Sequence, residues 1–329
     1  MSMKELSMDR ICRKSYNERD LYTIRGKGMT LQQLKYLVTV AECGSISEAA
    51  QKLFISQPSL SAAIQNLEKE MGVTAFSRSS KGVVITREGE ELLAYSRMLL
   101  EQADIMQEHF GKDKNRTPKF SVSCQHYSFA VNAFVDLVKQ YDASQYNFIL
   151  RETQTGEIID DVAQGKSEVG ILYLSAHNEE VLTKLMKKNG LVFEELFVAE
   201  PHVFICREHP LANKKEITLD DLQPYPYLVY EQGERNSFYF AEEFLSMLDF
   251  PKNIQVRDRA TLFNLVIGLN GFTVCSGVID QKLNGENIIA KPLVSDCDMR
   301  IGMICKKNTM LSRYALYYQE AIKNYLSIV

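Results

Sequence analysis

The chain has 329 residues, enough for two or three domains, because a domain usually contains about 100 to 200 residues. Its composition, with 45% hydrophobic and 24% charged residues, is that of a globular protein and excludes a disordered or fibrous one. The net charge of −4 excludes a nucleic-acid binder that depends on overall positive charge, so any affinity for DNA must come from a local surface.

The spacing of cysteines and histidines predicts neither disulfides nor a metal site. The seven cysteines are scattered without a C-x-x-C pair, which is typical of a reducing compartment, and the histidines form no H-x-x-x-H pair. No apolar run reaches the ~18 to 20 residues of a membrane span, and the N-terminus lacks the apolar core of a signal peptide. We therefore expect a cytoplasmic protein with no membrane segment, metal or cofactor.

Residues 1–28 are polar and show neither a helical nor a strand period. We expect a flexible tail that precedes a functional start at Met29. The alternative is a basic arm that contacts DNA phosphates, because lysines and arginines are interleaved with the acids of this segment.

Three short helices are predicted between Thr30 and Met71. A T-x-x-Q capping box opens the first at Thr30, an S-x-x-E box opens the second at Ser45, and Ser56 caps the third, which has Pro58 in its first turn. The side chains expected to be buried are Leu31, Leu34, Leu37 and Val38, then Ala49, Ala50 and Leu53, then Leu60, Ile64, Leu67 and Met71. Two short helices joined by a tight turn are typical of a helix-turn-helix.

The exposed face of the third helix carries small or hydrogen-bonding side chains. They are Gln57, Pro58, Ser59, Ser61, Ala62, Gln65, Asn66 and Lys69. Such a face suits the major groove, where glutamine and asparagine pair with adenine, serine with bases or phosphates, and alanine with a thymine methyl. An ordinary polar helix face is the alternative, but it would not account for the paired capping boxes and the tight turn.

Residues 76–86 are predicted to form a strand, a flexible tip and a return strand. Arg78 and Lys81 at this tip would reach phosphates or the minor groove, as in the wing of a winged helix; a solvated hairpin is the alternative. Thr86 then caps a long helix. Its apolar seam, Leu92, Ser96, Leu99, Ala103 and Met106, predicts a two-fold dimer that presents two recognition helices to a pseudo-palindromic site.

The polar segment 111–118 predicts a hinge, and beyond it strand-like runs alternate with helical patterns. The runs are 120–124, 146–151, 169–174, 202–206 and 227–230. This alternation indicates an α/β architecture with mainly parallel strands, which makes the second half a candidate sensor domain.

Several of these stretches together resemble the LysR-type transcriptional regulators. The resemblance is carried by 29–37, 43–53, 55–61, 67–73, 76–83 and 86–89, and it continues more weakly in 208–212, 219–222 and 266–272. It covers nearly the whole chain after residue 28. It implies a DNA-binding regulator that forms a homotetramer and binds and bends an interrupted inverted repeat in double-stranded DNA near a promoter.

The resemblance also implies a domain plan. An N-terminal all-α winged helix-turn-helix at 29–87 and a linker and dimerisation helix at 88–110 precede the hinge at 111–118. An α/β domain at 119–329 follows, with two lobes like those of periplasmic solute-binding proteins. The first lobe would comprise about 119–197 and 298–329, and the second about 198–297. A small effector is expected in the cleft between them.

For DNA, the resemblance places base contacts at Gln57, Pro58, Ser61 and Ala62, and contacts to the backbone or minor groove at Ser45, Ser47, Ser59, Arg78 and Thr86. Gln65 and Lys81 complete the expected set from the helix face and the wing tip. Many members have arginine where this chain has Ala62, and basic residues where it has Gln65 and Asn66. We therefore expect a shifted base preference and weaker non-specific binding.

For the effector, the resemblance places contacts at the ends of two strands and in the facing lobe. The residues are Gln125, His126, Tyr127, Ser128, Thr153, Gln154, Thr155, Tyr230, Glu231 and Thr273. A helix that begins near Ser128 would offer free N–H groups, which favour a carboxylate. His126 would add a charge or a donor, unless it is structural. Cys124 alternates with Phe120 and Val122 and is therefore predicted to lie in the core.

Other classes of protein find less support. The run 165–167 resembles the end of a phosphate-binding loop, but Asp160 stands where a glycine is required and a strand follows instead of a helix. No G-x-S-x-G or G-x-G-x-x-G motif is present, so we expect no catalytic site. A redox-responsive regulator would use cysteines such as Cys297 and Cys305, although packing is the simpler role for both. The predicted function is DNA binding controlled by a small anionic metabolite, with redox sensing as the alternative.

Overall fold

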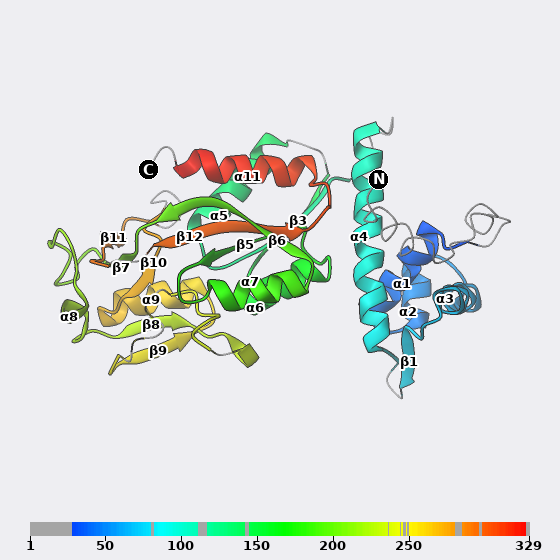
Figure 1. Ribbon diagram of the computed structural model, residues 1–329, viewed down its shortest axis with the longest axis horizontal. Coiled ribbons are helices and arrows are strands. Elements are labelled where there is room, and N and C mark those ends of the chain that lie inside the picture. The colour runs from blue at the N-terminus through cyan, green and yellow to red at the C-terminus, as the bar shows by residue number, and fades with distance from the viewer. Residues whose placement is uncertain are drawn as a thin grey trace, which may run out of the picture. The chain divides into compact units, whose positions relative to one another are not determined.

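The computed structural model describes residues 28–79, 82–110, 117–141, 145–235, 237–243, 245, 248, 250–279, 285–295 and 298–326. The expected tail, the wing-tip residue Lys81, hinge residues 111–116 and Cys297 lie outside these residues. The chain divides into two compact units, residues 1–96 and 97–329 (Figure 1).

The first unit consists of helices and one hairpin. Its elements are α1 (Leu31–Cys43), α2 (Ile46–Lys52), α3 (Gln57–Met71), β1 (Phe76–Ser79), β2 (Gly82–Ile85) and the start of α4 (Arg87–Phe110). The capping box of Thr30 and Gln33 forms in full at α1. At α2 and α3, the hydroxyls of Ser45 and Ser56 accept hydrogen bonds from backbone N–H groups three residues ahead. Local sequence therefore fixes where all three helices begin.

The core of the first unit lies between α1, α2 and α3, where Leu37, Leu60 and Leu67 are fully buried. Of the residues that were expected to be buried, Val38 and Leu53 are half-buried and two others are exposed. Leu31 is 45% exposed and Met71 is 37% exposed, because each occupies the terminal turn of its helix, beyond the region where the helices cross. The hairpin of β1 and β2 forms as predicted.

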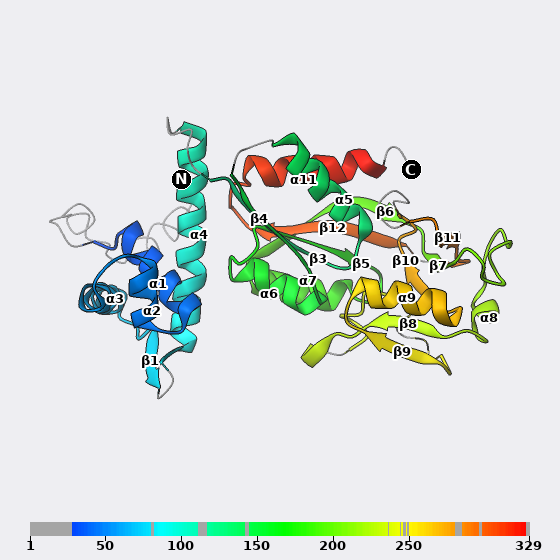
Figure 2. The ribbon, with the colours of Figure 1, turned by 180° about the vertical axis from the view of Figure 1, so that it is seen from behind.

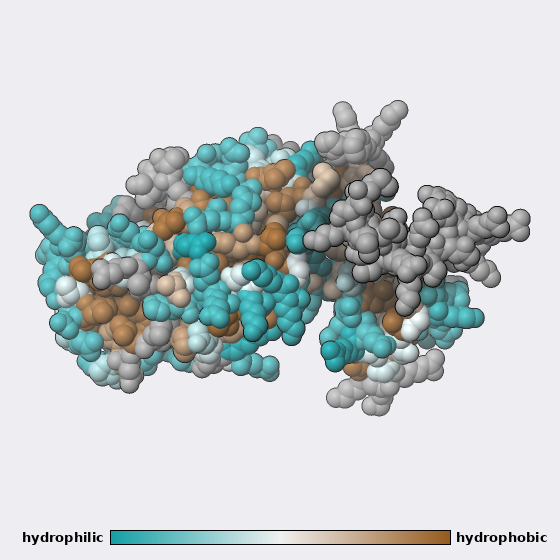
Figure 3. Space-filling model, viewed as in Figure 1, coloured by the Kyte–Doolittle hydropathy of each residue, from teal (hydrophilic) through white to brown (hydrophobic). Residues whose placement is uncertain are grey.

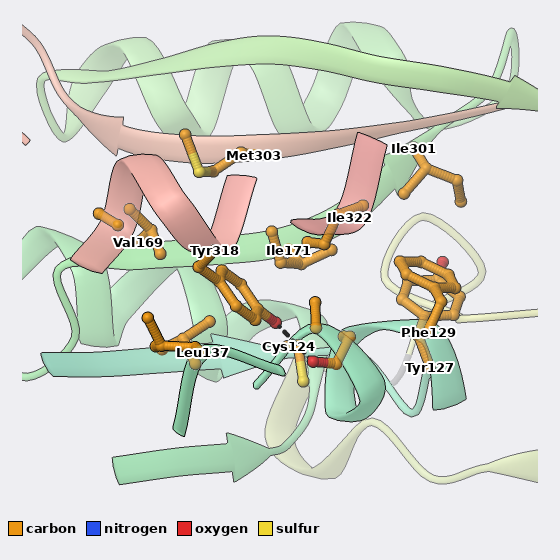
Figure 4. Close-up of a cluster of buried hydrophobic side chains, with 14 of the residues drawn as sticks. Cys124, Tyr127, Phe129, Leu137, Val169, Ile171, Ile301, Met303, Tyr318 and Ile322 are labelled. Carbon is orange, nitrogen blue, oxygen red and sulfur yellow. Dashed lines mark hydrogen bonds between the residues drawn. The ribbon is translucent and has the colours of Figure 1, made fainter. Parts of the chain in front are cut away.

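A five-stranded sheet organises the first lobe of the second unit. Its strands run in the order β4 (Asn147–Glu152), β3 (Lys119–Cys124), β5 (Val169–Leu174), β12 (Met299–Lys306), β6 (Leu191–Ala199). Helices α5 (Ser128–Gln140) and α11 (Arg313–Leu326) cover one face, and α6 (Thr155–Ala163) and α7 (Glu179–Lys188) cover the other (Figures 1 and 2). Figure 4 shows Cys124 in the core beneath α5 and α11, as its alternation with Phe120 and Val122 predicted.

The second lobe is built on a smaller sheet with the order β10 (Thr273–Cys275), β7 (His202–Cys206), β11 (Ile288–Pro292). Beside it, β8 (Tyr227–Tyr230) pairs in parallel with β9 (Asn253–Val256). The helical segments among the described residues of this lobe are α8 (Leu219–Leu222), the 3-10 turn η1 (Gly233–Arg235) and α9 (Arg259–Leu269).

All five predicted strands form, but the expectation of mainly parallel strands is wrong. β12 is antiparallel to both β5 and β6, and β7 is antiparallel to β10 and β11. The reason is topological. The chain leaves the first lobe after β6 and returns as β12, which inserts between β5 and β6 in the opposite direction.

The surface of the second unit in Figure 3 mixes hydrophilic residues with scattered apolar patches, which is normal for a globular surface. Among the helices of the described residues, none combines the length and the apolarity that a bilayer span requires.

Two helical glycines allow a matched test of packing. A Cβ atom on Gly89 would lie 2.1 Å from the Ala75 carbonyl oxygen, whereas a Cβ on Gly268 would meet nothing within 4 Å. We expect Gly89→Ala to destabilise the first unit by about 1 to 3 kcal/mol through overpacking. Gly268→Ala should stabilise α9 by ~0.5 to 1 kcal/mol, because alanine loses less backbone entropy in a helix. Calorimetric unfolding of both variants checks the pair, and equal effects would contradict it.

Candidate functional site

The N-terminal half of α3 presents most of the side chains that were predicted to read bases. Gln57, Pro58, Ser59, Ala62 and Gln65 are exposed, and Ser61 is half-buried. The Ser47 hydroxyl donates a hydrogen bond to Gln57 Oε1 at 2.9 Å, which orients the Gln57 amide from the neighbouring helix α2. The structure therefore brings the expected base-reading residues together on one face.

Three of the other predicted DNA contacts have structural partners within the chain. Ser59 donates its backbone N–H to the Ser56 hydroxyl, and the two hydroxyls lie 2.7 Å apart. Ser45 caps α2, and Thr86 caps α4 by accepting from the Gly89 N–H at 2.9 Å. Arg78 lies on β1, where its partner in the register is Val83.

The wing is tied to the recognition helix by one carboxylate. Glu68 Oε1, on α3, accepts the backbone N–H groups of Ala75 at 2.7 Å and Phe76 at 3.1 Å. The Val83 N–H also donates to the Gly44 carbonyl at 3.0 Å. These contacts fix where the hairpin leaves α3.

Sequence reasoning missed Phe54, in the turn between α2 and α3. Its side chain is 95% exposed, and its backbone adopts a φ of 55°, which a bulky residue rarely does. Phe54 lies three residues before Gln57, the first residue of α3. The pattern of the sequence predicted a turn here but gave no signal of exposure.

In the second unit, the predicted effector residues meet at the N-termini of α5 and α6. Neither helix is capped by a local side chain: Tyr127 and Gln154 stand at the N-cap positions without a capping hydrogen bond. Gln125 is fully buried and joins the two sites, since it donates to Thr155 Oγ1 at 2.6 Å and accepts from the Tyr127 hydroxyl at 2.8 Å. Gln125 therefore links the segments that precede α5 and α6 from a buried position.

The second lobe supplies a partner for the residue that precedes the N-cap of α5. Glu242 Oε2 accepts the backbone N–H of His126 at 2.9 Å, and its two oxygens lie 2.9 Å and 3.1 Å from His126 Nδ1. The Tyr230 ring stacks on the imidazole, with centroids 3.9 Å apart and planes 7° from parallel. Burial lowers the pKa of His126, but the charge and hydrogen bond of Glu242 raise the pKa by more, so that it lies above its usual value of 6.5.

The second lobe also supplies partners at α6 and at the end of β4. Gln232 Oε1 accepts the Thr155 N–H at 3.1 Å, and Arg235 donates to the Gly156 carbonyl at 3.0 Å. Arg259, at the start of α9, forms an ion pair with Glu152 at 3.2 Å. The lobes are thus joined by hydrogen bonds from residues that sequence reasoning did not single out.

Some buried polar atoms beside these contacts have no hydrogen-bond partner among the described residues. They are Thr273 Oγ1, Glu243 Oε2 and Gln154 Nε2. Thr273 and Glu243 line a small pocket together with His126, Ser128, Tyr230, Glu242 and Arg259. Burial raises the pKa of the Glu243 carboxyl well above its usual range, and the neighbouring Glu242 raises that pKa further. Partners for these atoms have to come from water or a ligand.

The remaining predicted effector residues contribute less to this pocket. Ser128 lines it but donates its hydroxyl to the Val278 carbonyl at 3.0 Å. The Thr153 hydroxyl donates to Glu157, and Glu231 pairs with Arg257 at 3.1 Å. Glu242 and Glu243 escaped prediction because two adjacent glutamates in a sequence usually indicate a solvated surface.

The cysteines of the described residues are free, and burial raises the thiol pKa of Cys124, Cys275 and Cys305. A raised pKa disfavours the reactive thiolate, so these three residues lend no support to redox sensing. Within the same described residues, no group of three or more His, Cys, Asp and Glu side chains could hold a metal ion.

Comparison with solved structures relates the whole chain to full-length regulators. A full-length OxyR variant from Pseudomonas aeruginosa shares the fold with a TM-score of 0.64 and 21% identity, over 91% of this chain and 96% of that chain. The regulator CbnR, in a structure with its target DNA, has a TM-score of 0.55 and 18% identity. The match covers 90% of this chain and 100% of the CbnR chain.

Comparison of sequences gives the family. Residues 31–90 match the family described as bacterial regulatory helix-turn-helix protein, lysR family, and residues 124–326 match the LysR substrate binding domain. The Hca operon transcriptional activator HcaR of Escherichia coli is 25% identical over 92% of this chain and 97% of its own length. The uncharacterized regulator YnfL of the same organism is 31% identical over 64% and 68%. These relatives are transcriptional regulators and not enzymes, and the chain belongs to the LysR family of DNA-binding transcriptional regulators.

Proposed function

We propose that this regulator reads an interrupted inverted repeat through the N-terminal half of α3, as a homodimer within a homotetramer, and that a small molecule in the cleft between its lobes controls promoter binding. The observation that carries the DNA part is the exposed face of α3, on which Ser47 orients Gln57. An oriented amide is ready for two hydrogen bonds to an adenine edge.

The proposed surface relies on hydrogen bonds and apolar contact more than on charge. Gln57 and Ser61 offer donors and acceptors, and the Ala62 methyl suits a thymine methyl. The wing residues Arg78 and Lys81 would supply phosphate contacts. Because Ala62, Gln65 and Asn66 carry no charge, the salt dependence of binding should be modest for a regulator of this size.

The double substitution Gln57→Ala and Ser61→Ala tests base reading. It should weaken binding to the cognate operator by ~1 to 3 kcal/mol for each specific contact, while the oligomeric state stays unchanged. Gel-shift titration measures the affinity. Gln140→Ala, an exposed glutamine at the end of α5, is the control and should have no effect. Operator affinity equal to that of the unmodified chain would rule out this base-reading surface.

Helix α4 supports the proposed dimer. Tyr95, Leu99 and Met106 are 56%, 40% and 58% exposed, and their spacing of four and seven residues places them on one face. Ser96, which was expected in the seam, is buried and donates its hydroxyl to the Leu92 carbonyl at 2.7 Å. The exposed apolar stripe therefore runs through Tyr95 instead of Ser96.

A charge in this stripe should separate the subunits. Leu99→Glu would bury a carboxylate in the proposed interface, which costs more than the interface gains unless a cation pairs with it. We expect the mass measured by light scattering to fall to half that of the unmodified chain. Leu316→Glu, at a 52% exposed leucine on α11, serves as the matched control. An unchanged mass for Leu99→Glu would place the dimer interface elsewhere.

The cleft supports an effector that carries a carboxylate. His126 and Arg259 supply cationic partners, the start of α5 supplies N–H groups, and Thr273 offers a buried hydroxyl without a partner among the described residues. A ligand that satisfied Thr273 would gain a hydrogen bond to a buried hydroxyl. Such a ligand would contact both lobes and would therefore change the relative populations of the conformations of the domain.

Thermal-shift screening of the full chain with amino acids, acylated serines and organic acids tests the effector. A compound present at 100 times its Kd stabilises the folded state by about 2.7 kcal/mol, so at least one acid should raise the Tm. The same compound should lose its effect on the variant Thr273→Val, which keeps the shape of the side chain but removes the hydroxyl. The absence of any stabilising acid would argue against a carboxylate sensor.

A further inference from the structure

The carboxylate of Glu242 makes the contacts that a bound carboxylate ligand would make. It is 6% exposed, comes from the irregular segment 237–243 of the second lobe, and reaches across to the first lobe. One oxygen accepts the His126 backbone N–H at 2.9 Å, and both oxygens lie within 3.1 Å of His126 Nδ1. Gln232 Nε2 approaches the other oxygen at 3.4 Å. Charge-assisted contacts of this kind are also those by which proteins recognise anionic ligands.

The residues around this contact have the features of a ligand-binding site, which a contact that only joins the two lobes would lack. The Tyr230 ring holds the imidazole by stacking on it. Thr273 is 4% exposed and Glu243 is 1% exposed; both line the same pocket, and each has a buried polar atom without a partner among the described residues. A contact that served only to join the lobes would have no need of unsatisfied polar atoms beside it, because each buried polar atom without a partner destabilises the folded state.

The charges around the pocket leave no place for a second anion. Glu242 pairs with His126 and Glu152 pairs with Arg259, so both cationic side chains of the pocket already have an anionic partner. The remaining space admits only a few water molecules. A carboxylate placed beside Glu242 would be a like charge at short range in a buried site, which is strongly unfavourable. An anionic effector must therefore take the position of Glu242.

We propose that Glu242 is an internal ligand that occupies the carboxylate site at the start of α5, and that a carboxylate-bearing effector acts by displacing it. The inference rests on the proposed effector cleft and adds how the signal arises. When the Glu242 side chain leaves, segment 237–243 loses its hydrogen bonds to the first lobe, and the arrangement of the two lobes changes. The effector competes with a residue of the chain itself, so its apparent affinity is reduced by the fraction of molecules in which Glu242 is bound.

Chemical rescue with acetate tests the internal ligand in the full-length protein. Glu242→Ala removes the carboxylate and leaves a cavity of its size beside His126. We expect this variant to unfold at a lower temperature than the unmodified chain, and sodium acetate to restore part of the loss in a saturable way, compared with sodium chloride at equal ionic strength. Acetate should not raise the Tm of the unmodified chain, because Glu242 fills the site.

Two matched variants separate this site from general effects of acetate. Glu286→Ala removes a glutamate of the same lobe that pairs with Arg207 outside the proposed site, and acetate should not rescue it. Glu242→Gln keeps the volume of the side chain, so acetate should have no room to bind. If Glu242→Ala does not accumulate in a folded form, Glu242→Ser provides the same cavity and retains one polar group near the His126 N–H.

The outcomes are distinct. Saturable rescue confined to the Ala or Ser variant supports the internal ligand. Equal stabilisation of all variants, or none of a folded Glu242→Ala, overturns it. So does stabilisation of the unmodified chain by methylammonium chloride that is lost in Glu242→Ala, because Glu242 would then bind a cation. If acetate fails to rescue the variant but an acid from the screen stabilises the unmodified chain, the proposal of an internal ligand is wrong and the proposed effector cleft stands.

Discussion

The unpaired N–H groups at the beginning of a helix are the constraint on which both functional surfaces depend. A helix leaves its first N–H groups without partners, and they must be satisfied by side chains, water or ligands. At α6 no local side chain forms a capping bond, and Gln232 of the second lobe accepts the Thr155 N–H instead. At α5, which also lacks a side-chain cap, Glu242 accepts the N–H of His126, the residue before the N-cap. The need for partners at two helix ends thus draws the lobes together and concentrates anion-seeking groups in the cleft.

In the DNA-binding unit, side chains close in sequence accept hydrogen bonds from the first N–H groups of the helices. Thr30, Ser45, Ser56 and Thr86 each accept a backbone N–H three residues ahead, so its helices depend little on distant parts of the chain. This independence suits a unit whose recognition surface has to stay constant while the other unit responds to a ligand. Glu68 links α3 to the wing in the same unit, because its carboxylate accepts the backbone N–H groups of Ala75 and Phe76.

Buried carboxylates and cations in the cleft give it the properties of a switch. Burial makes unpaired charge costly, so the His126 and Glu242 pair persists only while each satisfies the other or a ligand replaces one of them. The arrangement differs from that of the cysteines, whose burial raises their thiol pKa and favours the unreactive protonated form. The second unit is therefore better suited to a sensor in which an anionic ligand replaces a buried carboxylate than to one that depends on thiol oxidation.

Those features of the fold that depend on residues close together in the chain could be predicted from the sequence alone. Caps, helix periods and strand alternation predicted α1, α2, α3, the wing and five strands of the second unit, and the exposed face of α3 followed from its buried stripe. Tertiary structure decided what depends on distant segments: the antiparallel insertion of β12, the exposure of Phe54, and the pairing of Glu242 with His126, 116 residues away. No local pattern marks a glutamate that will be buried against another lobe, because its burial is produced only when the two lobes close on each other.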